Sequence, residues 1–309
     1  PAALAMTDGR WICAGMDRNG LRPFRYVVRG DGLVIGGSEV GMVPVDETDV
    51  IEKGRLGPGQ LLAVDMGDGR VLHDAEIKDE LSQQHPYAEW RSKILDLSKE
   101  LAGLPEPQAF EGDELRRRQI AAGYTMEELE AILHPMGEEA KEAVGSMGDD
   151  TPAAVLSERY RPLSHFFRQN FSQVTNPPID SLREYGVMSL KTRFGNLKNV
   201  LDEDSSQAEI ITLESPVVSN GQIARMVEAF GEHYRVIDCT FPAGAPRGAL
   251  REALQRIRAE AEEAVRAGAA HLLLTDEGVD EDHVAMPMIL ATSAVHSWLT
   301  RQGLRTFTS

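Results

Sequence analysis

The sequence predicts a mixed protein, α+β in its N-terminal part and α/β in its C-terminal part. In residues 1–77, three Asp-Gly pairs separate short apolar runs, which is typical of hairpins in an antiparallel sheet. From residue 208 onward, strand-like and helix-like periods alternate, which favours right-handed βαβ units and a parallel sheet, either barrel-like or open. A helical pattern fills the stretch between them. We therefore expect three regions.

The N-terminal region is expected to form hairpins at three turns: Asp8-Gly9, Asp31-Gly32 and Asp68-Gly69. Such pairs favour type I′ turns, which need positive φ at both central positions. Cys13 lies in the middle of an expected strand and is interpreted as a small buried apolar side chain. Arg22 and Arg25 either pin a turn beneath the sheet or bind a carboxylate. Since Pro1 leads directly into strand-like sequence, the chain is expected to begin inside a domain.

The connecting region, roughly residues 78–162, is expected to be helical. Its first helix should follow Pro86 and bury four side chains: Trp90, Ile94, Leu97 and Leu101. Two more helices are expected over 115–122 and 125–133, the second opened by a Thr125/Glu128 capping box. Arg116–Arg118 should be a solvated face. Asp149–Pro152 is interpreted as a helix start rather than a metal-binding pair.

The C-terminal region is expected to contain three strands and the beginning of a fourth: 209–213, 234–239, 271–276 and 304–309. The helices between them should be capped at Asn220, ended at Gly268, opened at Pro287 and ended at Gly303. Neither GxGxxG nor GxxxxGK[ST] is present, so the sequence indicates no Rossmann dinucleotide site and no P-loop.

An acidic stretch, Asp276–His283, follows the third of these strands, where sites in α/β folds gather. It could attract Mg²⁺, although its spacing is not that of an EF-hand and acidic surface loops are common. One alternative is therefore a self-sufficient α/β enzyme that uses this cluster. Another is a stand-alone interaction module without catalysis.

The segment from Gln169 to Gly195 has an unusual composition. A helical pattern is broken at Asn176-Pro177-Pro178, and a Ser181/Glu184 capping box predicts that a second helix starts at once. The plain interpretation is a rigid corner between helices. The residues bunched at this break are Thr175, Asn176, Pro177, Pro178, Asp180, Arg183 and Glu184.

The composition limits the functional class. Hydrophobic residues make up 42% and charged residues 26% of the chain, as in soluble globular proteins. No apolar run is long enough to span a membrane, and the net charge of −17 argues against a nucleic-acid partner. Two widely separated cysteines without a CxxC pattern are typical of free thiols in a reducing cytoplasm.

Three stretches together resemble the central region of the large subunit of bacterial, NADPH-type glutamate synthase: SMGDDTP (146–152), FRQNFSQVTNPPIDSLRE (167–184) and VMSLKTRFGNLKN (187–199). Three others resemble the later part of a class II (N-terminal-nucleophile) glutamine amidotransferase domain: MDRNGLRPFRY (16–26), GGSEVGMV (36–43) and LGPGQLLAVD (56–65). The resemblance extends over nearly the whole chain. It implies an amidotransferase remnant over 1–80, a helical connector over 81–160 and a central α/β domain over 161–309.

In that family, a glutaminase domain releases ammonia from glutamine, and a tunnel leads the ammonia to an FMN-containing barrel that makes glutamate from 2-oxoglutarate. The resemblance implies FMN, an iron–sulfur cluster and a small iron–sulfur/FAD subunit in the parent protein, and no cofactor in this part. The family's nucleophile is an N-terminal cysteine, whereas this chain starts with Pro1 and Cys13 lies within a strand. No catalytic residue is therefore assigned. The expected role is that of a scaffold and a wall of the ammonia tunnel, formed by the residues bunched at the break.

Overall fold

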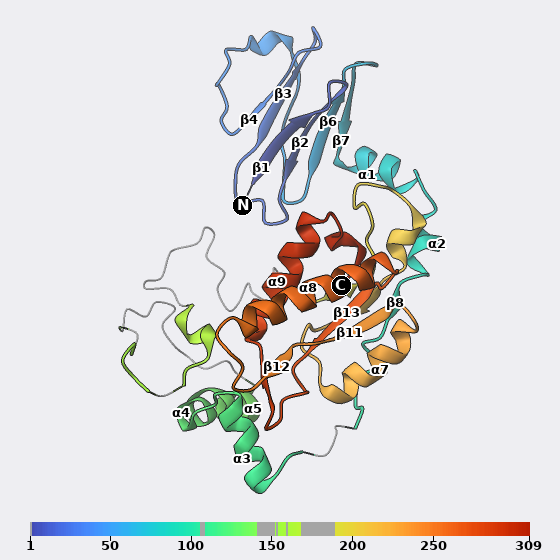
Figure 1. Ribbon diagram of the computed structural model, residues 1–309. Helices are drawn as coiled ribbons and strands as arrows, with labels where there is room; N and C mark the ends of the chain where they lie inside the picture. The colour runs from blue at the N-terminus through green and yellow to red at the C-terminus, as the bar shows by residue number, and fades with distance from the viewer. Residues whose placement is uncertain (1, 106–108, 141–151, 153, 159, 168–188) are drawn as a thin grey trace. The chain divides into compact units, whose positions relative to one another are not determined.

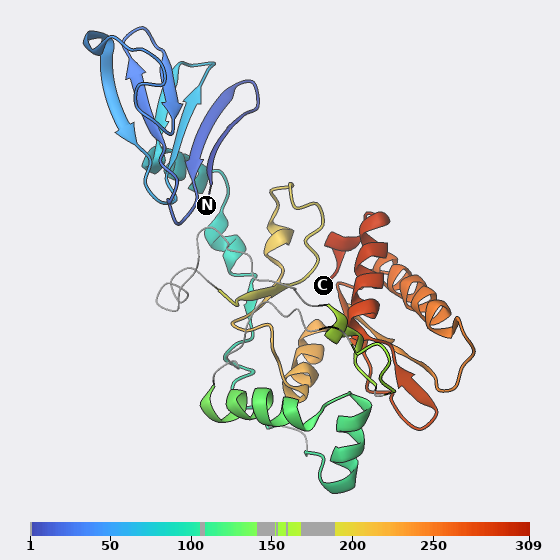
Figure 2. The same cartoon turned by 90° about the vertical axis from the view of Figure 1, so that its left-hand side faces the viewer.

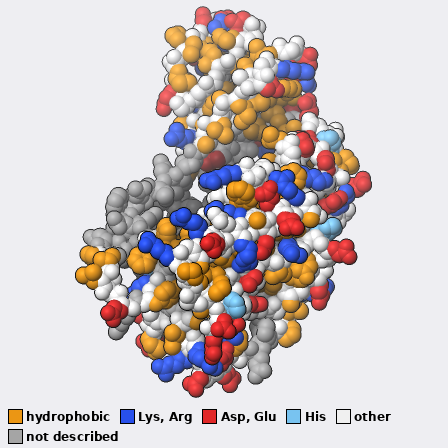
Figure 3. Space-filling view, in the orientation of Figure 1, with side chains coloured by type: hydrophobic (Ala, Val, Ile, Leu, Met, Phe, Trp, Pro, Cys, Tyr) orange, Lys and Arg blue, Asp and Glu red, His pale blue; other side chains and the backbone are white. Residues whose placement is uncertain are grey.

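The computed structural model describes residues 2–105, 109–140, 152, 154–158, 160–167 and 189–309 (Figure 1). Clustering of contacts separates residues 1–89 from a second compact unit that starts at residue 90. The two units are considered one at a time. In the face drawn in Figure 3, Lys and Arg side chains are interspersed with Asp and Glu rather than gathered apart from them.

The N-terminal unit contains two antiparallel sheets (Figure 1, Figure 2). The first has the order β1-β2-β6-β7, made of Ala3–Thr7, Trp11–Met16, Leu61–Asp65 and Arg70–His73. The second has the order β4-β3-β5, made of Val34–Gly37, Arg25–Arg29 and Val50–Arg55. Every pair within them is antiparallel, which confirms the sheet predicted from the Asp-Gly pairs.

Side chains from both sheets form the core of this unit. Alternate residues of β2 and β3 point inward, as the two-residue period of a strand requires. The buried cluster consists of Ala14, Met16, Phe24, Tyr26, Val28, Leu56 and Leu62. The hydroxyl of Tyr26 donates to the Glu52 carboxylate at 2.7 Å, which gives this aromatic side chain a polar partner at the edge of the core.

The hairpin turns form where expected, but they are not type I′. Among the described residues, positive φ outside glycine occurs at Ala140 and Lys198, so none of the three turn aspartates adopts it. At the first turn, Gly9 has φ of +96°, and the Asp8 carboxylate accepts from the backbone N–H groups of Arg10 and Trp11 at 2.9 and 2.7 Å. These bonds lower the pKa of Asp8. The side chain thus stabilises a wider turn that needs only one residue with positive φ.

A buried carboxylate lies at the end of β6, an inner strand of the first sheet. The side chain of Asp65 is fully buried and accepts from Nε and Nη2 of Arg10 at 3.1 and 2.8 Å, and from the backbone N–H of Gly67 at 2.9 Å. The bidentate bond from Arg10 lowers the pKa of Asp65 to about 2. Helix α1 (Asp74–Ser82) follows β7.

The second unit begins with a difference from the sequence prediction. Helix α2 (Tyr87–Arg91) is short, and the chain then forms strand β8 (Leu95–Asp96) instead of a helix extending to Leu101. Strand β8 pairs in parallel with β10 (Ile211–Leu213), whose other edge pairs antiparallel with β9 (Thr192–Phe194). Leu97 and Leu101 are buried as predicted, at 1% and 3% exposure. The predicted helix was wrong because pairing with a distant strand overrides the local period.

The helices that follow agree with the sequence. They are α3 (Gly112–Ala121) and α4 (Met126–Glu128), which continues through a π-helical turn (Leu129–Leu133) into α5 (His134–Glu139). The predicted capping box is present, since Thr125 and Glu128 bond each other's backbone N–H groups. Arg117 and Arg118 are exposed and pair with Glu114, which confirms the solvated face. Leu163–Phe166 forms a single 3-10 turn.

The C-terminal part contains the expected strand–helix–strand pattern. Strands β11 (Tyr234–Asp238) and β13 (His271–Thr275) pair in parallel, with α8 (Ala249–Arg266) between them in sequence. The short strands β12 (Thr240–Pro242) and β14 (His283–Ala285) pair antiparallel. The described residues form small sheets and no closed barrel, because β10 pairs with β8 and β9 rather than with β11.

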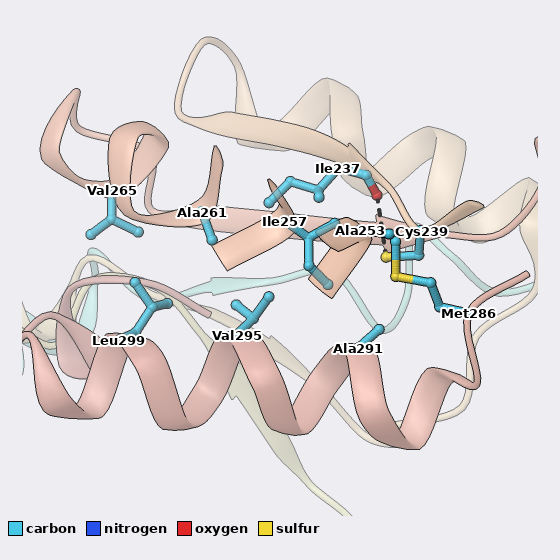
Figure 4. Close-up of a cluster of buried hydrophobic side chains, with 10 residues drawn as sticks. All are labelled: Ile237, Cys239, Ala253, Ile257, Ala261, Val265, Met286, Ala291, Val295 and Leu299. Carbon is cyan, nitrogen blue, oxygen red and sulfur yellow. Dashed lines mark hydrogen bonds between the residues drawn. The ribbon is translucent and has the colours of Figure 1, made fainter. Parts of the chain in front are cut away.

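Helices α8 and α9 (Met288–Arg301) present facing apolar stripes, which meet beside strand β11 (Figure 4). The cluster consists of Ile237, Cys239, Ala253, Ile257, Ala261, Val265, Met286, Ala291, Val295 and Leu299. Alanines at three of these positions let the helices approach closely. The Cys239 thiol is fully buried and donates to the Ile237 carbonyl at 3.7 Å.

Helix boundaries follow the predicted signals with one exception. Gly268 and Gly303, with φ of +100° and +68°, follow the ends of α8 and α9, and Pro287 precedes α9, as predicted. The cap of α7 (Asn220–Phe230) is Ser219 rather than Asn220, since the Ser219 hydroxyl accepts from the backbone N–H of Gln222.

The predicted beginning of a strand over 304–309 was wrong. Residues Arg305–Phe307 form a 3-10 turn, and only Ser309 bonds the β13 region, with N–O distances of 2.8 Å to Leu272 and 2.9 Å to Ala270. Within the described ranges, no helix is both long and apolar enough to cross a membrane.

Candidate functional site

The predicted site residues all fall in one stretch that lies outside the described residues: Thr175, Asn176, Pro177, Pro178, Asp180, Arg183 and Glu184. The Ser181/Glu184 capping box lies outside them as well, as does most of the helix start at 149–152. These assignments therefore stay predictions.

The segment that follows this stretch is held by the far end of the chain. Gly195 is buried; its N–H donates to the Ser309 hydroxyl at 2.7 Å, and that hydroxyl donates to the Gly195 carbonyl at 3.1 Å. The backbone N–H of Leu197 donates to the Thr306 carbonyl at 2.9 Å. With φ of +152° and Ile210 3.0 Å from where a Cβ would stand, position 195 requires glycine.

A cavity of about 420 Å³ lies beside Gly195, entirely within the second unit. Its wall includes Phe230 and His271, whose rings stack with centroids 4.0 Å apart and an interplanar angle of 14°. Burial, with a smaller contribution from the charge of His233, lowers the pKa of His271 to about 4. The Nδ1 atom of His271 is buried without a hydrogen-bond partner. The ring is therefore neutral at pH 7.

The second unit is expected to lose stability on acidification because of His271. In the unfolded chain its pKa returns to about 6.5, whereas in the folded chain it is about 4. The unfolded state thus binds the proton more readily, so stability is complete above about pH 6.5 and falls as the pH drops toward about 4. Melting temperatures at pH 7 and pH 5 test this. The loss should be smaller in His271→Phe, which keeps the stacking; an equal loss in both proteins would contradict this assignment.

A second cavity, of about 400 Å³, lies in the N-terminal unit between the β4-β3-β5 sheet and residues 39–47. Arg25 and Arg55 occupy directly opposed positions on β3 and β5, and both line this cavity. Arg22 is exposed and lies outside the lining. Neither Arg22 nor Arg25 forms an ion pair with any acid of the described residues. The interpretation that Arg25 pins a turn is thus not supported by an ion pair among the described residues.

The acidic stretch Asp276–His283 is organised by one carboxylate. Asp280 accepts from the backbone N–H groups of Asp282 and His283 at 2.9 and 2.7 Å, and its Oδ1 lies 2.9 Å from Nδ1 of His283. The contact with His283 is the main cause that lowers the pKa of Asp280. In the part of the chain that the structure describes, no three His, Cys, Asp or Glu side chains gather as metal ligands would. The Asp280 carboxylate thus stabilises a turn.

The two thiols do not have the surroundings of catalytic cysteines. Cys13 lies within β2 and is half-buried, and Cys239 is buried at the end of β11. Burial raises the pKa of both, whereas a nucleophilic cysteine needs a lowered one. Two cysteines are also too few for the Cys ligation typical of iron–sulfur clusters. The residues of this chain therefore do not fit such a cluster.

Comparison with known proteins covers both units. The profile of the "Glutamate synthase central domain" family matches residues 117–309, and that of "Glutamine amidotransferases class-II" matches residues 1–90. The glutamate synthase [NADPH] large chain of Azospirillum brasilense is 58% identical over 312 aligned positions, which cover 100% of this chain and 21% of that protein.

Two further relatives give the same picture. The glutamate synthase [NADPH] large chain of Bacillus subtilis is 39% identical over 99% of this chain and 20% of its own length. The chloroplastic ferredoxin-dependent glutamate synthase of Oryza sativa is 38% identical over 99% of this chain and 19% of its own length. The chain thus spans about a fifth of the length of these curated relatives. It belongs to the glutamate synthase central-domain family and carries a class II amidotransferase region before that domain.

Proposed function

We propose that this chain is an internal part of a glutamate synthase large subunit, which makes L-glutamate from L-glutamine and 2-oxoglutarate by reductive transfer of the amide nitrogen. The observation that carries the proposal is the order of the two family matches within one chain, together with 58% identity along its whole length to a protein of that name. Residues 1–80 would end the glutaminase domain, 81–160 form the connector and 161–309 form the central domain.

We assign both catalytic steps, glutamine hydrolysis and the reductive amination of 2-oxoglutarate, to parts of the large subunit outside this chain. Neither thiol has the lowered pKa of a nucleophile. In the parent protein, FMN and an iron–sulfur cluster supply the electrons for reduction at the synthase site, and a small iron–sulfur/FAD subunit delivers them. We place the assembly in the cytoplasm, with the rest of the large subunit and this small subunit as its partners.

The role proposed for this part is to hold the two reaction sites apart and to form part of the wall between them. Ammonia must cross as the neutral molecule, because the ammonium ion has no lone pair with which to attack a carbonyl. A wall suited to this exclusion of water is stiff and carries few charges. The Asn176-Pro177-Pro178 sequence has both properties.

Replacing Asn176 by Asp in the complete enzyme is expected to uncouple the two half-reactions. A carboxylate in the wall would attract ammonium and water, so ammonia would escape before it reached 2-oxoglutarate. The ratio of glutamine hydrolysed to 2-oxoglutarate aminated, measured with free ammonia in the same assay, should rise several-fold. Pro177→Ala should act in the same direction by loosening the wall.

Pro246→Ala is a matched control, because Pro246 is exposed in the turn before α8. It should leave the ratio unchanged. Tight coupling in both the Asn176→Asp and the Pro177→Ala enzymes would overturn the wall, while the overall activity of the complete enzyme tests the family reaction separately.

A further inference from the structure

The cavity beside Gly195 has the size of a small-molecule site, at about 420 Å³. It lies at the amino ends of the parallel strands: Lys93 precedes β8, Glu209 precedes β10, and His271 begins β13. Catalytic sites of α/β folds gather at the opposite, carboxyl ends. A ligand in this cavity would therefore be an effector or a structural ligand rather than a reacting substrate.

Two lysines that line the cavity bond the same 3-10 turn. Nζ of Lys93 donates to the Ser205 hydroxyl and the Glu209 carboxylate, both at 3.0 Å, and Nζ of Lys198 donates to the Ser206 hydroxyl at 2.8 Å. Ser205 and Ser206 are neighbours in one 3-10 turn, and both lysines also act electrostatically on Asp204, the residue before it, so both ammonium groups lie near this turn. Each ammonium group has more N–H donors than these contacts use. Two carboxylates face these charges: Glu209, which lines the cavity and pairs with Lys93, and Asp204, whose pKa is lowered chiefly by hydrogen bonds from Ser206 and further by both lysines.

The rest of the wall is apolar or neutral. Phe194, Ile210 and Phe230 line it, and the His271 ring lies flat on Phe230. The low pKa of His271 keeps that end uncharged. Its neighbour His233 lines the cavity from the chain just before β11. The cavity thus has an end that presents two lysine ammonium groups and an aromatic and aliphatic body, in a chain whose net charge is −17.

We propose that this cavity binds a small organic carboxylate, with the carboxylate group on the ammonium groups of Lys93 and Lys198 and the hydrocarbon body against Phe230 and Ile210. Carboxylates accept the remaining N–H donors in charge-assisted hydrogen bonds. The neighbouring carboxylates of Glu209 and Asp204 disfavour ions of high charge density such as phosphate, which also lack an apolar body for the wall. This assignment concerns only the second unit and does not depend on the proposed function.

Calorimetric titration of the 309-residue chain with acetate, succinate and benzoate tests the proposal. At least one of these should bind saturably, and its uncharged amide should not. Lys198→Gln should weaken binding at least about ten-fold, because a charge-assisted hydrogen bond is lost. Lys93→Gln should act alike. Lys191→Gln is the matched control: it removes the same charge from an exposed lysine of the same unit that does not line the cavity.

The lysine side chains are exposed, so circular dichroism should show an unchanged fold in all three variants. Absence of saturable binding of all three carboxylates in the millimolar range would overturn the proposal. Equal weakening by Lys191→Gln would also do so, since it would indicate non-specific attraction. Competition by inorganic phosphate at equal concentration would contradict the role given to the apolar wall.

Discussion

Replacing Ile257 by alanine is expected to destabilise the second unit by about 2–5 kcal/mol. Ile257 lies on α8 at the centre of the cluster in Figure 4, where its side chain is fully buried among Ile237, Val295 and Met286. The substitution removes three side-chain carbons and leaves a cavity. The neighbouring side chains are fixed on α8, α9 and β11, so they cannot move in to fill it. Hydrogen exchange of β11 and β13 peptides, followed by mass spectrometry, reports the loss for this unit alone.

Ile289→Ala provides the matched control for this experiment. This substitution removes the same side-chain atoms as Ile257→Ala, but Ile289 lies on α9 and is 44% exposed. The expected cost is below about 1 kcal/mol, as for other surface positions. Equal protection in the two variants would mean that the α8–α9 contact does not form the core of this unit.

Replacing Gly20 by alanine is expected to destabilise the N-terminal unit by about 2–5 kcal/mol, from two costs that add. Gly20 has φ of +59°, and a Cβ there would stand 2.7–2.9 Å from three atoms of Pro58. The turn has little freedom to move, since the Gly20 N–H bonds Asp17 and the Gly59 N–H bonds the Asp17 carbonyl. Because Trp90 and Trp298 lie in the second unit, hydrogen exchange of β2 and β6 peptides, rather than tryptophan fluorescence, measures the change for the N-terminal unit alone.

Gly9→Ala separates the two costs. Gly9 also has positive φ, at +96°, but no atom lies within 4 Å of the position of its Cβ. Only the backbone cost of about 1–2 kcal/mol should remain. If Gly20→Ala were no more destabilising than Gly9→Ala, the contact between the Asp17–Gly20 turn and Pro58 would not be a constraint on the fold.

Local signals explain which elements the sequence could predict. The Asp-Gly hairpins depend on residues adjacent in the chain, and so does the Thr125/Glu128 capping box. Strand β8 could not be foreseen, because Leu95 and Asp96 become a strand only through pairing with Ile211 and Thr212. Leu97 and Leu101 are buried whether this segment forms a helix or the short strand β8 followed by a turn. Their burial was therefore predicted correctly, although the type of element was not.

The cavities lay beyond prediction for a related reason. Lys93, Lys198 and His271 are far apart in the sequence, and no motif marks them. The turn at 305–307 and the bonds of Ser309 likewise depend on contacts with Gly195 and Ala270. In contrast, residues 175–184 could be singled out because the prolines and the family resemblance are both features of one continuous stretch of sequence.

The most direct test of the proposed wall is an isotope experiment on the complete enzyme. Glutamine labelled with ¹⁵N in its amide is supplied with 2-oxoglutarate, the electron donor and an excess of unlabelled ammonium. If ammonia passes along an enclosed path past residues 175–184, the new amino group of glutamate should carry the label undiluted, and Asn176→Asp should dilute it. Label diluted to the level of the free ammonium in the unaltered enzyme would contradict an enclosed path.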